Sequence, residues 1–460
     1  MSVTKKNNRR AEKVMKTILS PIDRFLRLET SGGLLLIFVT IIAMVWANSP
    51  WHEIYEHMIH TKIGISIEGF SLKMTLHEWV NDALMVIFFF LVGLEIKQEL
   101  IIGELASPKK AALPMFAALG GMVVPALIYF FFNNEGPGKP GWGIPMATDI
   151  AFAVGILSLM SRKVPFALKI FLLALAIVDD LGAVLVIALF YTENLAANPI
   201  AWSFLGLLAV SFLKYSGIRK IPVYTILGCL IWFAILKSGV HATISGVVLG
   251  LMTPVIPFIR KSDAPGKIKK VVDDLQGHLT ELEEDEVSTN YLDKETKDKL
   301  EKLHYLSIES RSPLDRLIYL LHPIVSYFIM PTFALVNAGV NLSGVKMTAL
   351  FENPISLGVI LGLFIGKPLG IVLFAWLSVK TKLAQLPQHV GWYHMACVGC
   401  LGGVGFTMAL FVSHLALKTP GLETYSKLGI LIASLFSALA GLLMLYFAKD
   451  SSATDHQEGN

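Results

Sequence analysis

Two adjacent carboxylates stand in the middle of a long apolar run. Residues 166–191 read FALKIFLLALAIVDDLGAVLVIALFY, with Asp179 and Asp180 near the centre. A run of about 26 residues is long enough to cross a bilayer as a tilted helix. A carboxylate at that depth costs roughly 2.5–3.5 kcal/mol on insertion scales, and two neighbours repel, so their protons leave at different pH. The pair therefore indicates an intramembrane cation or proton site; the alternative is a structural pair that neighbouring helices satisfy.

A lysine in a second apolar run could balance this charge. Lys367 lies near the middle of residues 356–377, which read SLGVILGLFIGKPLGIVLFAWL. A lysine at membrane depth needs an acidic partner or loses its proton, so Asp179 and Asp180 are its candidate partners. The Gly-Lys pair here is not a phosphate loop, because proline follows the lysine where that motif has Ser or Thr.

Two further apolar runs contain helix-breaking residues. In GWGIPMATDIAFAVGILSL, Pro145 interrupts the helix and Thr148 and Asp149 follow. Broken helices occur at membrane depth only inside a protein or beside a water-filled cavity. Interrupted spans at matching places in two halves of a chain point to a transporter's binding site, where freed backbone groups can face ions. The matching run, ACVGCLGGVGFTMALFV, is interrupted by Gly402, Gly403 and Gly405.

Other ionisable residues also lie within or at the ends of apolar runs. Glu95 and Glu99 are four residues apart and share one helix face at its cytoplasmic end. His241 lies near the end of a run, and histidine titrates in the physiological range. Asp82 lies in HEWVNDALM. For the glutamates and the histidine, an interfacial position without a role is an equal alternative.

Composition places the chain among membrane proteins. Of its 460 residues, 54% are hydrophobic and 16% charged, and the mean hydropathy is +0.61. The formal charge of +4 does not argue for a nucleic-acid partner, because the basic residues lie mostly between apolar runs. The three cysteines, Cys229, Cys397 and Cys400, lie in apolar runs and are interpreted as packing residues. No cofactor is expected.

The apolar runs predict an all-α polytopic membrane protein with about twelve transmembrane helices. The seventh and eighth runs are separated only by Lys237-Ser238, so eleven spans is an open alternative. The runs lie near 31–48, 78–101, 111–133, 142–160, 166–192, 200–215, 222–236, 239–257, 314–338, 355–379, 391–415 and 425–447.

Basic residues orient these runs. They are concentrated in the first 30 residues and in every second connection, which places both termini in the cytoplasm. A secretory signal is the rival interpretation of the N-terminus, but its basic region is long for one. The predicted domains are a cytoplasmic tail (1–30), spans one to eight (31–258), a charged cytoplasmic loop (259–313), spans nine to twelve (314–447) and a second cytoplasmic tail (448–460).

Two connections differ from the rest. Residues 63–75 alternate apolar and polar around Glu68-Gly69, which predicts a short β-hairpin on the outer face. Residues 260–312 are charged and polar, with ELEEDE at 281–286, and predict a loop that is partly helical or disordered. We expect this loop to be a solvated tether without ion chemistry.

Taken together, these motifs resemble the NhaA family of bacterial sodium/proton antiporters over most of residues 25–447. The resemblance implies inverted repeats of spans 3–5 and 10–12 with crossing broken helices four and eleven. It also implies electrogenic export of sodium, with lithium as a second substrate, in exchange for protons across the bacterial inner membrane. The motifs are ATDIAFA at 147–153, ALKIFLLALAIVDDLGA at 167–183, LKSGVHAT at 236–243, GKPLGI at 366–371 and GVGFTM at 403–408.

The resemblance also assigns roles to residues. Asp180 matches the principal ion-binding aspartate, and Asp179 matches its neighbour, which contacts the lysine found here as Lys367. Thr148 and Asp149 match the broken-helix pair beside the site, so sodium is expected at Asp180, Asp179 and Thr148. The remaining matches are Asp82 in the ion path, Glu95, Glu99 and His241 in the pH response, and the 63–75 hairpin in homodimer formation. The implied physiology is pH homeostasis and salt tolerance.

Three features depart from the family pattern. The 260–312 loop is long, Ile318 stands where the family has an acidic residue, and Gln98 stands where a basic residue is usual.

Two other functions are alternatives to an exchanger. An intramembrane aspartyl protease also needs two membrane aspartates, but its Tyr-Asp and Gly-x-Gly-Asp motifs are absent around Asp149 and Asp179. A channel, or a transporter for another cation, remains the alternative to an exchanger.

Overall fold

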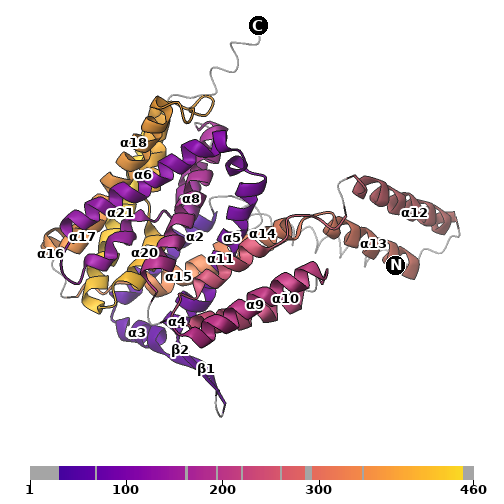
Figure 1. The fold of residues 1–460 in the computed structure, drawn as a ribbon, viewed down its shortest axis with the longest axis horizontal. Helices are drawn as coiled ribbons and strands as arrows, with labels where there is room; N and C mark the ends of the chain where they lie inside the picture. Colours follow the sequence, from indigo (N-terminus) through magenta and orange to yellow (C-terminus); the bar gives the residue numbers. More distant parts are fainter. Residues whose placement is uncertain are drawn as a thin grey trace, which may run out of the picture.

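Helices make up most of the described chain, with a short two-stranded sheet beside them (Figure 1). The computed structural model describes residues 31–67, 70–160, 164–192, 195–218, 221–259, 262–284, 293–343 and 347–448. Outside these residues lie the predicted tail 1–30, all but the first residue of the predicted tail 448–460, the turn Glu68-Gly69 and the end of the acidic stretch 281–286.

The elements are named in chain order, with η for 3-10 and π-helical segments. Their bounds are α2 (Ser31–Ala47), α3 (His52–His60), β1 (Lys62–Ile67), β2 (Phe70–Thr75), α4 (Leu76–Trp79), η1 (Val80–Leu84), α5 (Met85–Ile101), η2 (Glu104–Ala106), α6 (Pro108–Phe132), η3 (Lys139–Met146), α7 (Ile150–Leu159), α8 (Phe166–Phe190), α9 (Ala197–Tyr215), α10 (Ile221–Leu236), α11 (Thr243–Met252), α12 (Ala264–Glu284), α13 (Lys294–Glu309), α14 (Pro313–Ile324), η4 (Val325–Ile329), α15 (Met330–Asn337), α16 (Met347–Glu352), α17 (Pro354–Leu361), η5 (Gly362–Gly366), α18 (Lys367–Lys380), α19 (Trp392–Gly402), α20 (Phe406–Ala416) and α21 (Pro420–Phe447).

Within the described residues, 8 helices are long and apolar enough to cross a membrane, or up to 10 if each of two bent pairs forms one span. The bent pairs are α2 with α3, at 112°, and α19 with α20, at 47°. The expected runs 222–236 and 239–257 correspond to the shorter helices α10 and α11, because the chain turns between them at Gly239, whose φ is +83°. The chain is therefore a multi-pass membrane protein, and the count of twelve spans stays a prediction.

The helices α6 and α18 approach each other so closely that no side chain fits at their contact. A Cβ atom built on Gly120 would lie 2.2 Å from the Gly370 carbonyl oxygen, and one built on Gly370 would lie 2.1 Å from the Gly120 carbonyl oxygen. Small residues allow such packing in a bilayer, where the hydrophobic effect does not drive helices together. The contact holds the start of α18, and with it Lys367, against α6.

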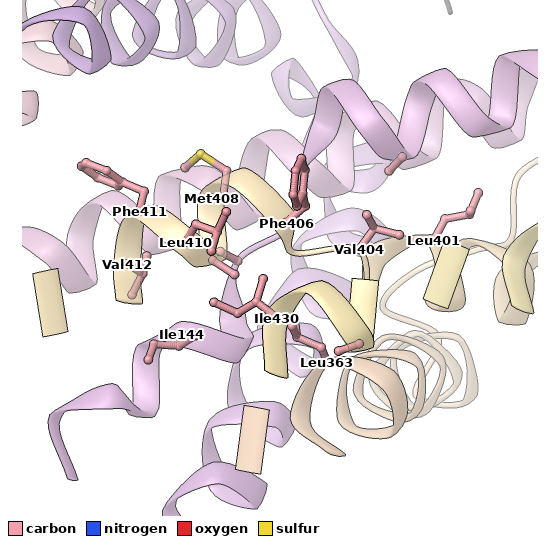
Figure 2. Packing of buried hydrophobic residues seen from close by; sticks show 14 of the residues in the cluster. Ile144, Leu363, Leu401, Val404, Phe406, Met408, Leu410, Phe411, Val412 and Ile430 are labelled. Carbon is pink, nitrogen blue, oxygen red and sulfur yellow. The ribbon is translucent and has the colours of Figure 1, made fainter. Parts of the chain in front are cut away.

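Two interrupted helices meet inside the bundle. One break, residues 147–149, lies between η3 and α7, and the other, residues 403–405, lies between α19 and α20. The breaks touch, because the Asp149 N–H donates to the Val404 carbonyl oxygen at 2.8 Å. Figure 2 shows Val404 and the neighbouring Phe406 within the buried apolar cluster around this point. Segments far apart in the chain therefore bring their free backbone groups to one place.

The strands β1 and β2 form an antiparallel hairpin that projects from the bundle (Figure 1). Lys62 pairs with Thr75 at its base. A capping box fixes the hairpin to α4: the Glu78 N–H donates to the Thr75 hydroxyl at 3.1 Å, and the Thr75 N–H donates to the Glu78 carboxylate at 2.6 Å. The hairpin is thus attached to the helix that leads into Asp82.

The described part of the predicted 259–313 loop contains two helices, as the partly helical alternative expected. Helices α12 and α13 lie beside each other, away from the bundle (Figure 1), over a small apolar cluster that includes Val271 and Leu306. His278 Nε2 lies 3.0 Å from the Asp293 carboxylate, which also caps α13. Hydrogen bonds from Thr296 and His278 hold the pKa of Asp293 below its usual range, so this carboxylate stays ionised near neutral pH.

Candidate cation site

Helix α8 carries Asp179 and Asp180 at its midpoint. It runs for 25 residues without an internal proline, from Phe166 to Phe190. The two aspartates are buried, with exposed fractions of 2% and 1%. Buried carboxylates are rare unless they have partners, so the partners of each decide what the pair can do.

Asp179 has a complete set of partners on one oxygen. Lys367 Nζ lies 2.5 Å from Asp179 Oδ2, and the Thr148 hydroxyl lies 2.7 Å from the same oxygen. Lys367 also donates to the Met146 carbonyl oxygen at the end of η3. The lysine is 1% exposed and directly follows the π-helical segment η5. Its charge is therefore shared between a carboxylate and the carbonyl end of a broken helix, which carries partial negative charge.

Asp180 has no such partners. Neither of its carboxylate oxygens has a hydrogen-bond partner among the described residues, and the same holds for Asp179 Oδ1. Buried polar atoms are nearly always hydrogen-bonded, and an unpaired one in a native structure needs an explanation. Free carboxylate oxygens are the ligands that a hard cation prefers, and a carboxylate without partners also accepts a proton. The donor set at Asp180 therefore fits either a small hard cation or a proton.

Oxygen atoms from the two breaks lie next to this carboxylate pair. The Thr148 hydroxyl is within hydrogen-bond distance of the Gly402 carbonyl oxygen, at 2.9 Å, as well as of Asp179. Gly402 is the last residue of α19, while Gly403 and Gly405 lie in the break. A Cβ atom on Gly403 would lie 2.5 Å from the Leu363 carbonyl oxygen, so only glycine fits there.

Asp149 lies between the N-termini of two half-helices. Its Oδ1 accepts the Phe152 N–H of α7 at 3.0 Å, and its Oδ2 accepts the Thr407 N–H of α20 at 3.2 Å and the Thr407 hydroxyl. Helix N-termini carry partial positive charge, which a carboxylate stabilises. Unlike Asp180, Asp149 accepts hydrogen bonds on both oxygens. It therefore stabilises the point where the two broken helices cross.

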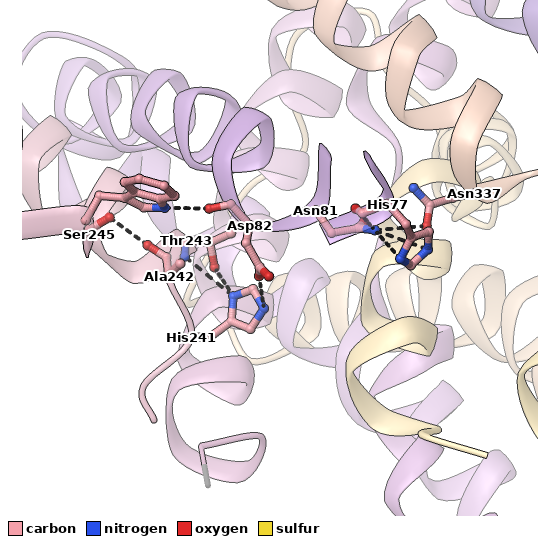
Figure 3. Close-up of polar contacts among 9 residues, drawn as sticks. His77, Asn81, Asp82, His241, Ala242, Thr243, Ser245 and Asn337 are labelled. Carbon is pink, nitrogen blue, oxygen red and sulfur yellow. Dashed lines mark hydrogen bonds and ion pairs between the residues drawn. The ribbon is translucent and has the colours of Figure 1, made fainter. Parts of the chain in front are cut away.

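The structure brings Asp82 and His241 together, although the sequence suggested separate roles for them. Figure 3 shows His241 Nε2 facing the Asp82 carboxylate, at 3.6 Å, while His241 Nδ1 lies 2.8 Å from the Thr243 hydroxyl. Asp82 lies in the π-helical segment η1, and its backbone carbonyl accepts the Trp232 indole N–H at 2.6 Å. The neighbouring Asn81 contacts His77 and Asn337 (Figure 3). A titratable pair therefore lies one turn from the start of α5.

A sequence profile described as Na+/H+ antiporter 1 matches residues 23–445. The chain belongs to this family. A relative from Sorangium cellulosum named Na(+)/H(+) antiporter NhaA 2 is 44% identical over 94% of this chain and 91% of its own length. A relative from Oleidesulfovibrio alaskensis named Na(+)/H(+) antiporter NhaA is 43% identical over 93% of this chain and 94% of its own. The solved structure of a sodium proton antiporter from Methanocaldococcus jannaschii aligns over 95% of this chain and 96% of its own with a TM-score of 0.42 and 15% identity.

In this member of the Na+/H+ antiporter 1 family, α5 brings two glutamates toward the aspartates. Val92 and Ile96 of α5 pack on Ile177 of α8, two residues before Asp179. Glu95 lies close enough to interact electrostatically with Asp180. Glu99 has a different partner, because its carboxylate accepts a hydrogen bond from the Glu104 N–H at 2.9 Å. Of the two glutamates, Glu95 is thus the one that interacts directly with Asp180, and Glu99 lies four residues further along the same helix.

The point where the antiporter's two broken helices cross also contains functional groups that the sequence did not indicate. The Thr407 hydroxyl donates to Asp149, and the backbone carbonyl of Met146 accepts a hydrogen bond from Lys367. Thr407 could have been found from its place directly after the glycine break. The carbonyl had no sequence signal, because every residue type supplies one.

Proposed function

We propose that this protein exchanges sodium, and also lithium, for protons across the cell membrane. The observation that carries the proposal is the buried Asp180 carboxylate, whose oxygens have no partner among the described residues. The chain belongs to the Na+/H+ antiporter 1 family, and relatives of nearly full length carry sodium/proton antiporter names. Such a carboxylate has two ways to satisfy its charge, a sodium ion or a proton, and antiport follows if they alternate.

Sodium and protons compete for the same oxygens in this mechanism. Sodium binds between Asp180, Asp179 and Thr148, with backbone carbonyls of the breaks as further ligands. Protonation of the aspartates removes the negative charge that holds sodium, and sodium binding favours loss of the proton. If the site opens to one side at a time, this competition couples the two fluxes. Exchange is electrogenic, with more protons entering than sodium ions leaving.

The remaining site residues support this exchange. Lys367 is the charge partner of Asp179, since the two side chains meet at 2.5 Å. Asp149 stabilises the crossing of the broken helices. Asp82 lies on the ion path. Residues in the pH response are Glu95, Glu99 and His241, of which His241 acts through Asp82.

The architecture we propose has twelve spans, with inverted repeats of spans 3–5 and 10–12 and both termini in the cytoplasm. The hairpin of β1 and β2 lies on the outer face and joins two copies into a homodimer. Residues 259–313 form a cytoplasmic unit. In a bacterial inner membrane, such an antiporter serves pH homeostasis and salt tolerance.

The test is the Asp180→Asn variant of the full chain, reconstituted in vesicles. Asparagine keeps the shape of the side chain but removes its charge and its titration. We expect sodium-driven proton movement to be abolished while the protein still reaches the membrane. Asp273→Asn is the matched control, because Asp273 is an exposed carboxylate on α12 outside the bundle. Normal exchange in Asp180→Asn would contradict the site, and sodium flux that ignores an imposed proton gradient would contradict exchange.

A further inference from the structure

An apolar groove of about 720 Å³ lies between α6 and η3. Val123, Leu127 and Phe130 of α6 form one wall, and Trp142 and Met146 of η3 form the other. The volume is within the range of roughly 300–1,000 Å³ that is usual for small-molecule sites. A groove with this lining binds an apolar chain rather than a polar solute.

The groove opens toward the surface that the bilayer covers. Helix α6 is one of the spanning helices, and only 33% of its apolar window is buried inside the protein. Leu127 and Phe131 are 62% and 78% exposed, respectively. In a membrane, lipid acyl chains surround such side chains, so a lipid is the available occupant of the groove.

The rim of the groove carries an exposed lysine whose neighbouring backbone is anchored. Lys139 is the only charged residue that lines the groove, and it has no ion pair within the described chain. Two tyrosine hydroxyls hold its loop: Tyr129 donates to the Gly138 carbonyl oxygen, and Tyr191 to the Pro140 carbonyl oxygen, each at 2.7 Å. The backbone on both sides of Lys139 is therefore anchored before any ligand arrives, which reduces the entropy lost on binding.

We propose that this groove holds an acyl chain of an anionic phospholipid whose phosphate binds Lys139. A single lysine at a membrane surface favours anionic over zwitterionic headgroups, because the choline or ethanolamine cation of the latter opposes its charge. Trp142, packed edge-to-face on Phe190 at 5.0 Å, lies beside the rim, where aromatic rings favour the headgroup level. The proposal rests on the membrane location and not on the exchange activity.

The lipid would also touch the wall of the cation site. Met146 lines the inner end of the groove, and its carbonyl oxygen accepts a hydrogen bond from Lys367. The groove and the cation site thus share one residue of η3. An occupied groove restrains this residue from the side that faces the bilayer.

Native mass spectrometry of the full-length, delipidated protein titrated with phosphatidylglycerol or phosphatidylcholine tests the proposal. We expect one phosphatidylglycerol to bind roughly fivefold more tightly than phosphatidylcholine, and Lys139→Gln to remove this preference. Ala126→Trp, which fills the groove, should displace both lipids. The matched control is Lys62→Gln, because Lys62 is an exposed lysine outside the groove, on β1.

Equal binding of the two lipids by the unaltered protein would overturn the proposal. So would an unchanged preference in Lys139→Gln, or an equal loss of preference in Lys62→Gln. Retained lipid in a folded Ala126→Trp variant would show that the chain lies elsewhere. Because none of these measurements depends on ion flux, failure of the exchange activity would leave their outcome unaffected.

Discussion

At the scale of single residues, the three buried aspartates have different surroundings. Asp179 shares one oxygen between Lys367 and Thr148, and Asp149 accepts hydrogen bonds on both oxygens from two helix N-termini. Asp180 has no partner within the described residues. An ion entering the site therefore meets one carboxylate whose oxygens are both free.

The first prediction concerns the lysine that pairs with Asp179. Lys367→Ala should destabilise the protein by about 3–5 kcal/mol and reduce exchange, because it leaves a buried carboxylate without its cation. Thermal unfolding in detergent and vesicle assays of proton movement measure the two effects. Lys380→Ala is the control, since Lys380 is an exposed lysine at the other end of α18. If both variants unfold at the same temperature, the pair does not stabilise the fold.

The second prediction concerns Thr407, which donates its N–H and its hydroxyl to Asp149. Thr407→Val removes the hydroxyl but keeps the shape, and should destabilise the crossing by about 1.5–3 kcal/mol, as for hydrogen bonds to charged groups. Thr407→Ser keeps the hydroxyl and should behave like the original protein in unfolding and exchange assays. Combined with Asp149→Asn, Thr407→Val should have little added effect. Fully additive effects would mean that the two residues act independently.

At the scale of elements, the two broken helices position the site and α12–α13 stand outside it. The breaks meet through the Asp149 N–H and the Val404 carbonyl, so the ends of four half-helices converge on one volume. By contrast, the described part of residues 259–313 has its own small cluster around Val271 and Leu306. The contacts of this unit with the bundle lie at its ends, such as the Glu309–Arg316 ion pair at 3.1 Å.

The third prediction is that deletion of residues 262–310 leaves sodium-driven proton flux measurable. The deletion points already lie together, because the Ile259 N–H donates to the Glu309 carbonyl oxygen at 3.0 Å. Loss of the partly exposed pair with Arg316 should cost at most about 1 kcal/mol. The measurement is flux per correctly inserted protein, with the full chain in parallel vesicles. Complete loss of flux in a well-inserted deletion variant would give this unit an essential role.

At the scale of the whole molecule, titratable groups lie at two places along the stretch formed by η1 and α5. Glu95 approaches Asp180 along α5, and His241 faces Asp82 at the start of the same stretch of chain. A charge change at either place can shift α5 relative to α8 without touching the cation. The pH response that we propose would therefore depend on how α5 is held at these two places.

The fourth prediction follows from that arrangement. Glu95→Gln, Glu99→Gln and His241→Ala should each move the pH profile of exchange, by about half a pH unit or more, while maximal exchange is largely kept. If competition at the aspartates alone set the pH profile, more sodium would instead restore exchange at low pH. Profiles at low and at saturating sodium separate the two effects, and His304→Ala, an exposed histidine on α13, is the control. Unchanged profiles in all three variants would leave competition as the sufficient explanation.

Residue type and spacing alone were enough to predict the membrane class, both breaks and the buried charged residues that meet beside them. The reason is that a bilayer makes every buried charge and every Gly- or Pro-rich interruption conspicuous against apolar sequence. Residue type and spacing did not tell which aspartate keeps free oxygens, because Asp179 and Asp180 are adjacent and chemically identical. Only the family resemblance assigned Lys367 to Asp179. Packing decided it: α18 meets α6 at Gly120 and Gly370, which directs Lys367 to Asp179. The pairing of Asp82 with His241 likewise depends on contacts between segments about 160 residues apart, which no local pattern records.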